Sequence, residues 1–235
     1  MLEEECSRAN YSSTLSSHLR LRVMKPPAPE EPTRPPLQPD TQKERKDVTY
    51  FVDKYLKLAG DAYQKRQFTL ALKYAKRAAE IGSAAPCPNP SSPSTHTLRS
   101  KLADSSEFQA DCELSLGRDK EALELYRQAA SMRATLYHTD KHLSLAGCIS
   151  NVCRIYRRHH AYSLALHYAL YLRDIYQYNG MTESVHMAMA LSHVSAVKKC
   201  QGLYTEALEL EKEGLNMRLR ILSGTHPAVA RSYHW

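Results

Sequence analysis

The fold is decided by residues 187–230, which read MAMALSHVSAVKKCQGLYTEALELEKEGLNMRLRILSGTHPAVA. The pair Met187-Ala188 opens this stretch. A similar apolar residue followed by alanine stands 42 residues before it, at Leu145-Ala146, and 42 residues after it, at Val229-Ala230. A fixed period between about 20 and 50 residues is typical of proteins built from stacked structural repeats. Such proteins bury each repeat against its neighbours and expose a long surface, which usually binds other proteins.

Other positions repeat at the same step and place the repeats in helices. Equivalent apolar residues are Ile149 and Leu191, Val152 and Val194, Tyr162 and Tyr204, Ala165 and Ala207, and Leu166 and Leu208. Within one repeat, Tyr55, Leu58, Ala59 and Ala62 share one helical face. Ala, Leu, Lys, Arg and Glu dominate and there are only 8 glycines, a composition that favours helices. The sequence therefore predicts an all-α solenoid.

The prediction divides the chain into a tail and a repeat array. Residues 1–46 are polar and then Pro-rich, so we expect a disordered N-terminal tail. The solenoid is expected over 47–235, with helix pairs at 47–82, 99–136, 143–178 and 185–222 and a truncated unit at 226–235. Four prolines predict a loop at 82–98, because proline does not continue a helix. Gly117, the His159-His160 step and Gly202 are expected to form the turns inside three of the pairs.

The residues inside these pairs resemble tetratricopeptide repeats. One copy of the pattern is Gly60-x-x-Tyr63 followed by Phe68-x-x-Ala71-Leu72, and another is Ser195, Gly202, Tyr204, Glu206-Ala207-Leu208 and Gly214. The longer period, together with Met217-Arg218-x-x-x-Leu222-x-Gly224-x-His226-Pro227, is similar to the kinesin light chain and nephrocystin-3 subgroup. The resemblance implies a right-handed α-solenoid that acts as a non-enzymatic scaffold or adaptor for partner proteins.

The same resemblance places a set of polar residues in the concave groove of the array. The set consists of Asn151, Arg154, Arg157, Arg158, His193 and Lys199, with Asp104, Glu107 and Asp111 one unit earlier. Arginine suits carboxylate or phosphate groups because its planar fork donates paired hydrogen bonds. We therefore expect an extended partner peptide of mixed charge, with its acidic part over Arg154–Arg158. The alternative is a solvated face with intramolecular Arg–Asp pairs. Asn151 matches the groove asparagine of kinesin light chains, whereas His193 and Trp235 stand at the next equivalent positions.

The motifs of enzymes and cofactor sites are missing from the sequence. There is no phosphate-binding glycine loop, no GxSxG and no HExxH. His138-x-x-x-His142 has a spacing that a metal could use, but no third ligand stands at a fixed distance. The six cysteines form no CxxC pair, which favours reduced structural thiols. We expect neither catalysis nor a metal or other cofactor.

Charge and hydropathy limit the classes of binding partner and the cellular compartment that we expect. The net charge is +7, and the segment between Thr41 and Arg77 holds ten Lys/Arg against four acids. Such a segment could contact acidic proteins, anionic lipid or nucleic acid. We do not expect nucleic acid, because no recognition motif accompanies the charge. No segment approaches the ~18 apolar residues of a membrane span, so we expect a cytoplasmic protein.

Both ends of the chain suggest further contacts. Pro29, Pro32 and Arg34 fit a motif that SH3 domains bind, but we favour a stiff solvated spacer as the interpretation of this segment. The array stops in mid-unit at Trp235, so the chain is expected to be a fragment, a short form, or a protein that self-associates through an uncapped C-terminal end. The alternative to peptide binding is a structural subunit of a ciliary or cytoskeletal assembly that uses convex or end surfaces.

Overall fold

The computed structural model describes residues 41–85 and 92–233. The chain divides into two units, Met1–Glu44 and Arg45–Trp235, and the second carries the repeats. Every regular element among the described residues is helical, which confirms the all-α prediction. The SH3-type motif and most of the predicted tail lie outside the described residues.

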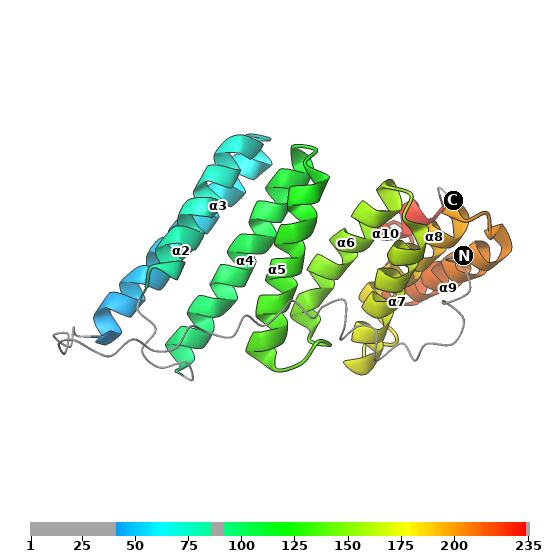
Figure 1. The fold of residues 1–235 in the computed structure, drawn as a ribbon. Coiled ribbons are helices and arrows are strands. Elements are labelled where there is room, and N and C mark those ends of the chain that lie inside the picture. The colour runs from blue at the N-terminus through cyan, green and yellow to red at the C-terminus, as the bar shows by residue number, and fades with distance from the viewer. Residues whose placement is uncertain (1–40, 86–91, 234–235) are drawn as a thin grey trace, which may run out of the picture. The chain divides into compact units, whose positions relative to one another are not determined.

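Four helix pairs follow one another in the described part of the chain (Figure 1). They are α2 (Thr41–Gln64) and α3 (Phe68–Ser83), α4 (Pro93–Ser115) and α5 (Asp119–Tyr137), α6 (Ala146–Arg158) and α7 (Tyr162–Tyr178), and α8 (Val185–Cys200) and α9 (Tyr204–Ile221). A single 3-10 turn, η2 (Leu143–Leu145), precedes α6, and the short helix α10 (Pro227–Ser232) follows α9. From α3 onward each α-helix contacts the next one, and α6 also contacts α8. This is the predicted solenoid of stacked helix pairs.

Two helices begin earlier than the sequence predicted. The helix α2 begins at Thr41, inside the expected tail, and α4 begins at Pro93, inside the expected loop 82–98. The start of α4 has a clear cause, because the Ser92 side chain accepts a hydrogen bond from the Thr95 amide at 3.2 Å. Pro93 takes the first helical position, where no amide hydrogen is needed. A proline that we interpreted as a break therefore starts the helix.

Small side chains allow the two helices of a pair to approach closely. In the third pair the Cys153 thiol donates to the Ala165 carbonyl at 3.3 Å. At the equivalent place in the fourth pair, the Ser195 hydroxyl donates to the Ala207 carbonyl at 2.9 Å. All four residues are buried. Larger side chains would separate the helices here, so the small residues at these repeat positions are explained by close contact of a short side chain with the backbone of the facing helix.

The turns inside the pairs depend on left-handed backbone. Gly117 and Gly202 have φ angles of 78° and 81°, and His160 has a φ of 60°. These are the positions at which the sequence predicted the turns, so that prediction is confirmed. Arg66 plays the same part between α2 and α3, with a φ of 58°. Glycine adopts this conformation without the steric penalty that other L-residues meet.

We expect Gly117→Ala to lower the free energy of unfolding by about 1 kcal/mol, because alanine is strained at positive φ. A Cβ atom at Gly117 would meet nothing within 4 Å, so the loss would be conformational and not steric. Gly60 lies inside α2 and has equally open surroundings. Gly60→Ala is the matched control and should stabilise the helix by about 0.5–1 kcal/mol. Urea denaturation followed by circular dichroism measures both; equal effects of the two substitutions would contradict the prediction.

Candidate functional site

Polar contacts connect the first helices of three successive pairs. The Asn151 side-chain amide on α6 donates to Oδ1 of Asp111 on α4 at 3.3 Å. On the other side of α6, Ser150 Oγ lies 2.9 Å from Nε2 of His193 on α8. The structure therefore brings Asp111, Asn151 and His193 into one lateral row. We use the name first-helix face for the surface of α4, α6 and α8 that carries this row.

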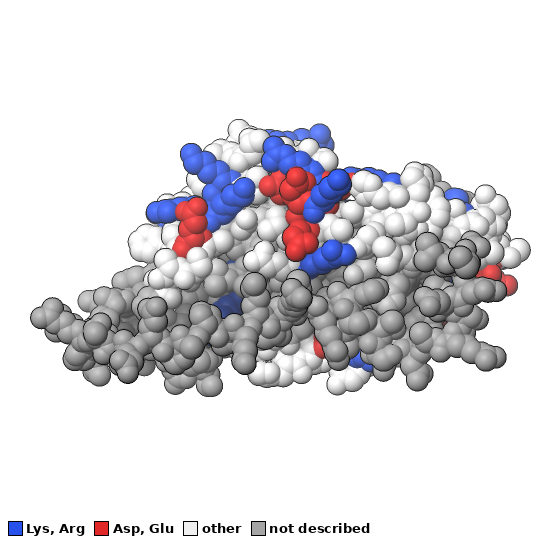
Figure 2. Space-filling model, in the orientation of Figure 1, with Lys and Arg blue, Asp and Glu red and all other residues white. Residues whose placement is uncertain are grey.

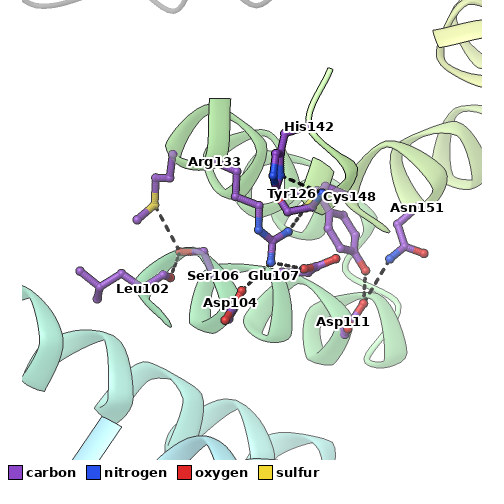
Figure 3. A network of polar contacts seen from close by, with 12 residues as sticks. Leu102, Asp104, Ser106, Glu107, Asp111, Tyr126, Arg133, His142, Cys148 and Asn151 are labelled. Atoms are coloured by element: carbon purple, nitrogen blue, oxygen red, sulfur yellow. Dashed lines mark hydrogen bonds and ion pairs between the residues drawn. The ribbon is translucent and has the colours of Figure 1, made fainter. Parts of the chain in front are cut away.

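Two of the predicted acidic residues are held by an arginine that the sequence analysis did not select. Nη2 of Arg133, on α5, lies 2.7 Å from Oδ1 of Asp104 and 2.6 Å from Oε2 of Glu107 (Figure 3). Its Nη1 donates to the Cys148 sulfur on α6 at 3.2 Å. Arg133 is buried, which disfavours its charge, but Glu107 and Asp104 more than offset this and raise its pKa. Asp104 and Glu107 therefore have an intramolecular partner.

Asp111 is also engaged within the chain. It accepts a hydrogen bond from the Tyr126 hydroxyl on α5 in addition to the one from Asn151 (Figure 3). Burial raises the pKa of the Asp111 carboxyl, although the Tyr126 hydrogen bond partly opposes that change. The structure thus uses this carboxylate to hold α4, α5 and α6 together.

The basic residues of α6 divide into paired and unpaired members. Arg158 Nη1 lies 2.7 Å from Oδ1 and 3.0 Å from Oδ2 of Asp119, the first residue of α5. His159 Nε2 lies 2.8 Å from the same carboxylate, which is buried. Arg158 therefore makes the intramolecular Arg–Asp pair that the alternative interpretation foresaw.

Arg154 and Arg157 are not neutralised in this way. Arg154 is exposed, and no described residue forms an ion pair with it, while its charge acts on both Asp111 and His193. Arg157 is half-buried, and its buried Nε finds no acceptor in the part of the chain that the structure describes. Lys199 is exposed near the end of α8. Net positive charge therefore gathers on the α6–α8 part of the first-helix face.

His193 is kept neutral by its surroundings. Burial lowers its pKa to about 4, and the nearby charges of Arg157 and Arg154 add to that effect. Its ordinary pKa in an unfolded chain is about 6.5. The unfolded state therefore binds more protons between these two values, and the protein should lose stability as the pH falls through that window.

We expect this loss to reach the order of 3 kcal/mol at pH 4 relative to pH 7. Replacing His193 with glutamine should remove the His193 contribution, because glutamine does not titrate. The measurement is the free energy of unfolding of both proteins at several pH values between 7 and 4. Parallel curves for the two proteins would contradict the lowered pKa.

Three residues that the sequence analysis missed organise this site: Arg133, Asp119 and Tyr126. One signal could have revealed Arg133. The dipeptides Met132-Arg133 and Met217-Arg218 stand at the same position of α5 and α9, counted from the first residue of each helix. An arginine that recurs at one repeat position beside buried neighbours indicates a structural ion pair.

The histidines and cysteines remained as candidates for metal binding or thiol chemistry, and their surroundings in the fold test both. His138 ends α5 with a left-handed backbone, and His142 Nδ1 accepts from the Ser144 amide at 3.2 Å. No group of three or more potential metal ligands gathers among residues 41–85 and 92–233. Cys112, Cys148 and Cys153 are buried free thiols, and burial raises the pKa of Cys112 to about 12. Cys200, one of the six cysteines that we expected to be structural thiols, is exposed instead. None of the described helices is long and apolar enough to cross a membrane.

Comparison with known proteins agrees with the repeat pattern. Residues 187–228 match the family "Tetratricopeptide repeat". The match covers one full period, from the third residue of α8 through α9 to the second residue of α10. Together with the fold, it supports the presence of tetratricopeptide-type repeats. No curated protein matches the sequence.

Solved structures share the fold at low sequence identity. The "kinesin light chain nearly identical TPR-like repeats" of Podosopora anserina are 18% identical, with a TM-score of 0.58 over 78% of this chain and 82% of that chain. BtubC (BKLC) from P. vanneervenii is 12% identical, with a TM-score of 0.64 over 84% of this chain and 82% of that chain. Aspartyl phosphate phosphatase F from Bacillus subtilis is 15% identical, with a TM-score of 0.63 over 82% of this chain and 48% of that chain. At these identities the likeness shows the fold alone.

Proposed function

We propose that this protein is a non-enzymatic scaffold that binds an extended peptide of a partner protein along the first-helix face. Arg154 and Arg157 would receive the acidic part of the peptide, with Lys199 extending the basic surface. Asn151 and His193 would lie beside the peptide backbone. The other members of the predicted set would hold the helices of this face together and would not contact the peptide, since each already has a partner within the chain. They are Asp104, Glu107, Asp111 and Arg158.

The observation that carries this proposal is the uncompensated charge of Arg154 in a continuous polar row. An exposed arginine between half-buried Asp111 and His193 can form a charge-assisted hydrogen bond without first breaking an ion pair. Arg157 is half-buried and forms no ion pair with a described residue, so its guanidinium can bind an acidic side chain in the same way. A repeat array with an open face of this kind is typical of protein-binding modules.

A second candidate function is a structural subunit of a cytoskeletal or ciliary assembly in the cytoplasm. The kinesin light chain repeats among the structural neighbours favour it. So do the exposed side chains of Tyr204 and Leu208 on α9, which are 66% and 47% accessible and offer an apolar end surface. A second copy of the chain could use the same surface, which would give the self-association expected from the sequence. In either case the first-helix face would not be required.

The test compares partner capture by the wild-type chain with capture by the Arg154→Glu/Lys199→Glu variant. Arg158 is left unchanged, because reversing its charge would place two carboxylates together at buried Asp119. The captured partner is mapped to a peptide, and its Kd is measured by fluorescence anisotropy. We expect the double reversal to weaken binding by at least about a hundredfold, roughly tenfold for each charge contact.

The matched control is Lys65→Glu/Lys212→Glu, which changes the net charge equally at exposed positions outside the first-helix face. The control should bind like the wild type. Equal helicity of all three proteins by circular dichroism excludes misfolding. If both double variants capture the same partners with the same affinity as the wild type, peptide binding at the first-helix face is wrong and the structural role is favoured.

A further inference from the structure

A second polar surface lies along α3, away from the residues of the first-helix face. Two hollows adjoin it, and Lys76 and Glu80 line both. The first hollow, of about 560 Å³, lies between α2 and α3 and is lined by Tyr55, Leu72 and Tyr74 among others. The second, of about 430 Å³, is bordered by α3, α4 and α5 and includes Leu102, Gln109, Gln128 and Met132. We call this surface, with both hollows, the α3 surface.

The rim of the first hollow is basic. Lys73, Lys76 and Arg77 are all exposed on α3. The single acid among the residues that line it, Glu80, is already paired with Arg77 at 2.9 Å. Neither Lys73 nor Lys76 forms an ion pair with any described residue. Figure 2 shows Lys and Arg side chains over α3, and Lys and Arg mixed with Asp and Glu over one end of α4 and α5. Two ammonium groups therefore remain available to an anionic partner.

The floor beneath these charges is apolar and aromatic. The rings of Tyr55 and Tyr74 lie 6.3 Å apart at a tilt of 40°, and Leu72 is buried beside them. In the second hollow, Leu102 and Met132 supply apolar contacts, while Gln109 and Gln128 carry amide groups that can bond a peptide backbone. Concave sites with apolar floors and a few polar groups are typical of ligand pockets.

We propose that the α3 surface binds an acidic segment of a protein in which glutamate or aspartate flanks a large apolar side chain. The apolar side chain enters the hollow that Tyr55 and Tyr74 line, and the carboxylates contact Lys73 and Lys76. A nucleic acid fits less well, because Glu80 lies among the cations and a nucleic acid presents a continuous row of phosphates. An anionic membrane fits less well, because its flat surface cannot fill two hollows.

The test uses a fluorescein-labelled synthetic peptide with one central tyrosine flanked by glutamates, and the same peptide with glutamines instead. Both are titrated with the full chain in fluorescence anisotropy. The glutamate peptide should bind and the glutamine peptide should not. The Lys73→Glu/Lys76→Glu variant should weaken binding at least about tenfold, because both contacts become repulsive.

Two controls assign the result to the α3 surface. Lys57→Glu/Lys65→Glu changes the net charge equally at exposed positions that line neither hollow, and it should bind like the wild type. Arg154→Glu/Lys199→Glu should also retain binding, so a loss there would place the peptide on the first-helix face and overturn the inference. Equal binding of the two peptides, or no binding of either, would overturn it as well.

A competition experiment separates the classes of ligand. Phosphatidylserine vesicles and a single-stranded oligonucleotide are added to the complex of the chain with the glutamate peptide. Neither should displace the peptide at physiological salt. Displacement by either competitor, together with direct binding of that competitor that the Lys73→Glu/Lys76→Glu variant loses, would assign the α3 surface to lipid or nucleic acid and would contradict a protein ligand.

Discussion

Replacing Arg133 with alanine is expected to lower the free energy of unfolding by about 3 kcal/mol. The reason is that Arg133, on α5, forms ion pairs with Glu107 and Asp104 on α4 and also contacts Cys148 on α6. Its side chain is 6% exposed and that of Glu107 is 23% exposed. Removing one partner of a buried pair leaves the other charge desolvated and uncompensated. Chemical denaturation followed by circular dichroism measures the change.

The matched control for Arg133 is Arg77→Ala, which removes an exposed arginine from its exposed pair with Glu80. Exposed pairs contribute little, so this change should stay within about 0.5 kcal/mol. The double variant Arg133→Met/Glu107→Leu should recover much of the loss, because no buried charge is then left alone. If Arg133→Ala and Arg77→Ala have the same small effect, the buried ion pair does not stabilise the array.

Replacing Arg218 with alanine should release α10 from the end of the array. Arg218 Nη1 donates to Ser232 on α10 at 2.6 Å, and Nη2 donates to the Ala188 carbonyl at 2.8 Å. Nη1 also lies 3.7 Å from the carboxylate of Glu211, whose side chain is 7% exposed. We expect about 3 kcal/mol of destabilisation, for the same reason as at Arg133.

Arg133→Ala and Arg218→Ala should differ in which helices lose protection of their amides from hydrogen exchange. In repeat proteins each unit contacts only its neighbours, so the effect of a substitution stays local. Hydrogen exchange of Arg218→Ala should therefore show faster exchange in α8, α9 and α10, while Arg133→Ala should affect α4, α5 and α6. Arg220→Ala removes an exposed pair with Glu183 and serves as the control. Unchanged exchange in α10 of Arg218→Ala would show that the guanidinium does not hold that helix.

Local sequence was sufficient to predict those structural features that have a local physical cause. The small residues Cys153 and Ser195 stand one repeat step of 42 residues apart, as do the turn residues His160 and Gly202, because every helix pair meets the same steric demand. Repetition makes such demands visible without an alignment. The start of α4 could not be predicted, since a proline preceded by serine is compatible both with a loop and with a capped helix.

The candidate site was harder to predict, because charged residues do not reveal their partners in sequence. Asp104, Glu107, Asp111, Arg154 and Arg158 were all expected to serve a peptide. The structure pairs all of them except Arg154 with residues of neighbouring helices. These partners lie between 15 and 40 residues away along the chain, and two of them, Asn151 and Asp119, belong to an adjacent helix pair.

The sequence by itself therefore determined the class of fold, the turns and the positions where helices approach closely, because those features depend on residue size and backbone conformation at a fixed period. Only the tertiary structure decided which charges are available. Whether a carboxylate supports the array or faces a partner depends on burial and on which guanidinium the stacking of helices brings within reach. Arg133 and Arg154 are both arginines in regular helices, yet one is enclosed by α4 and α6 and the other is exposed.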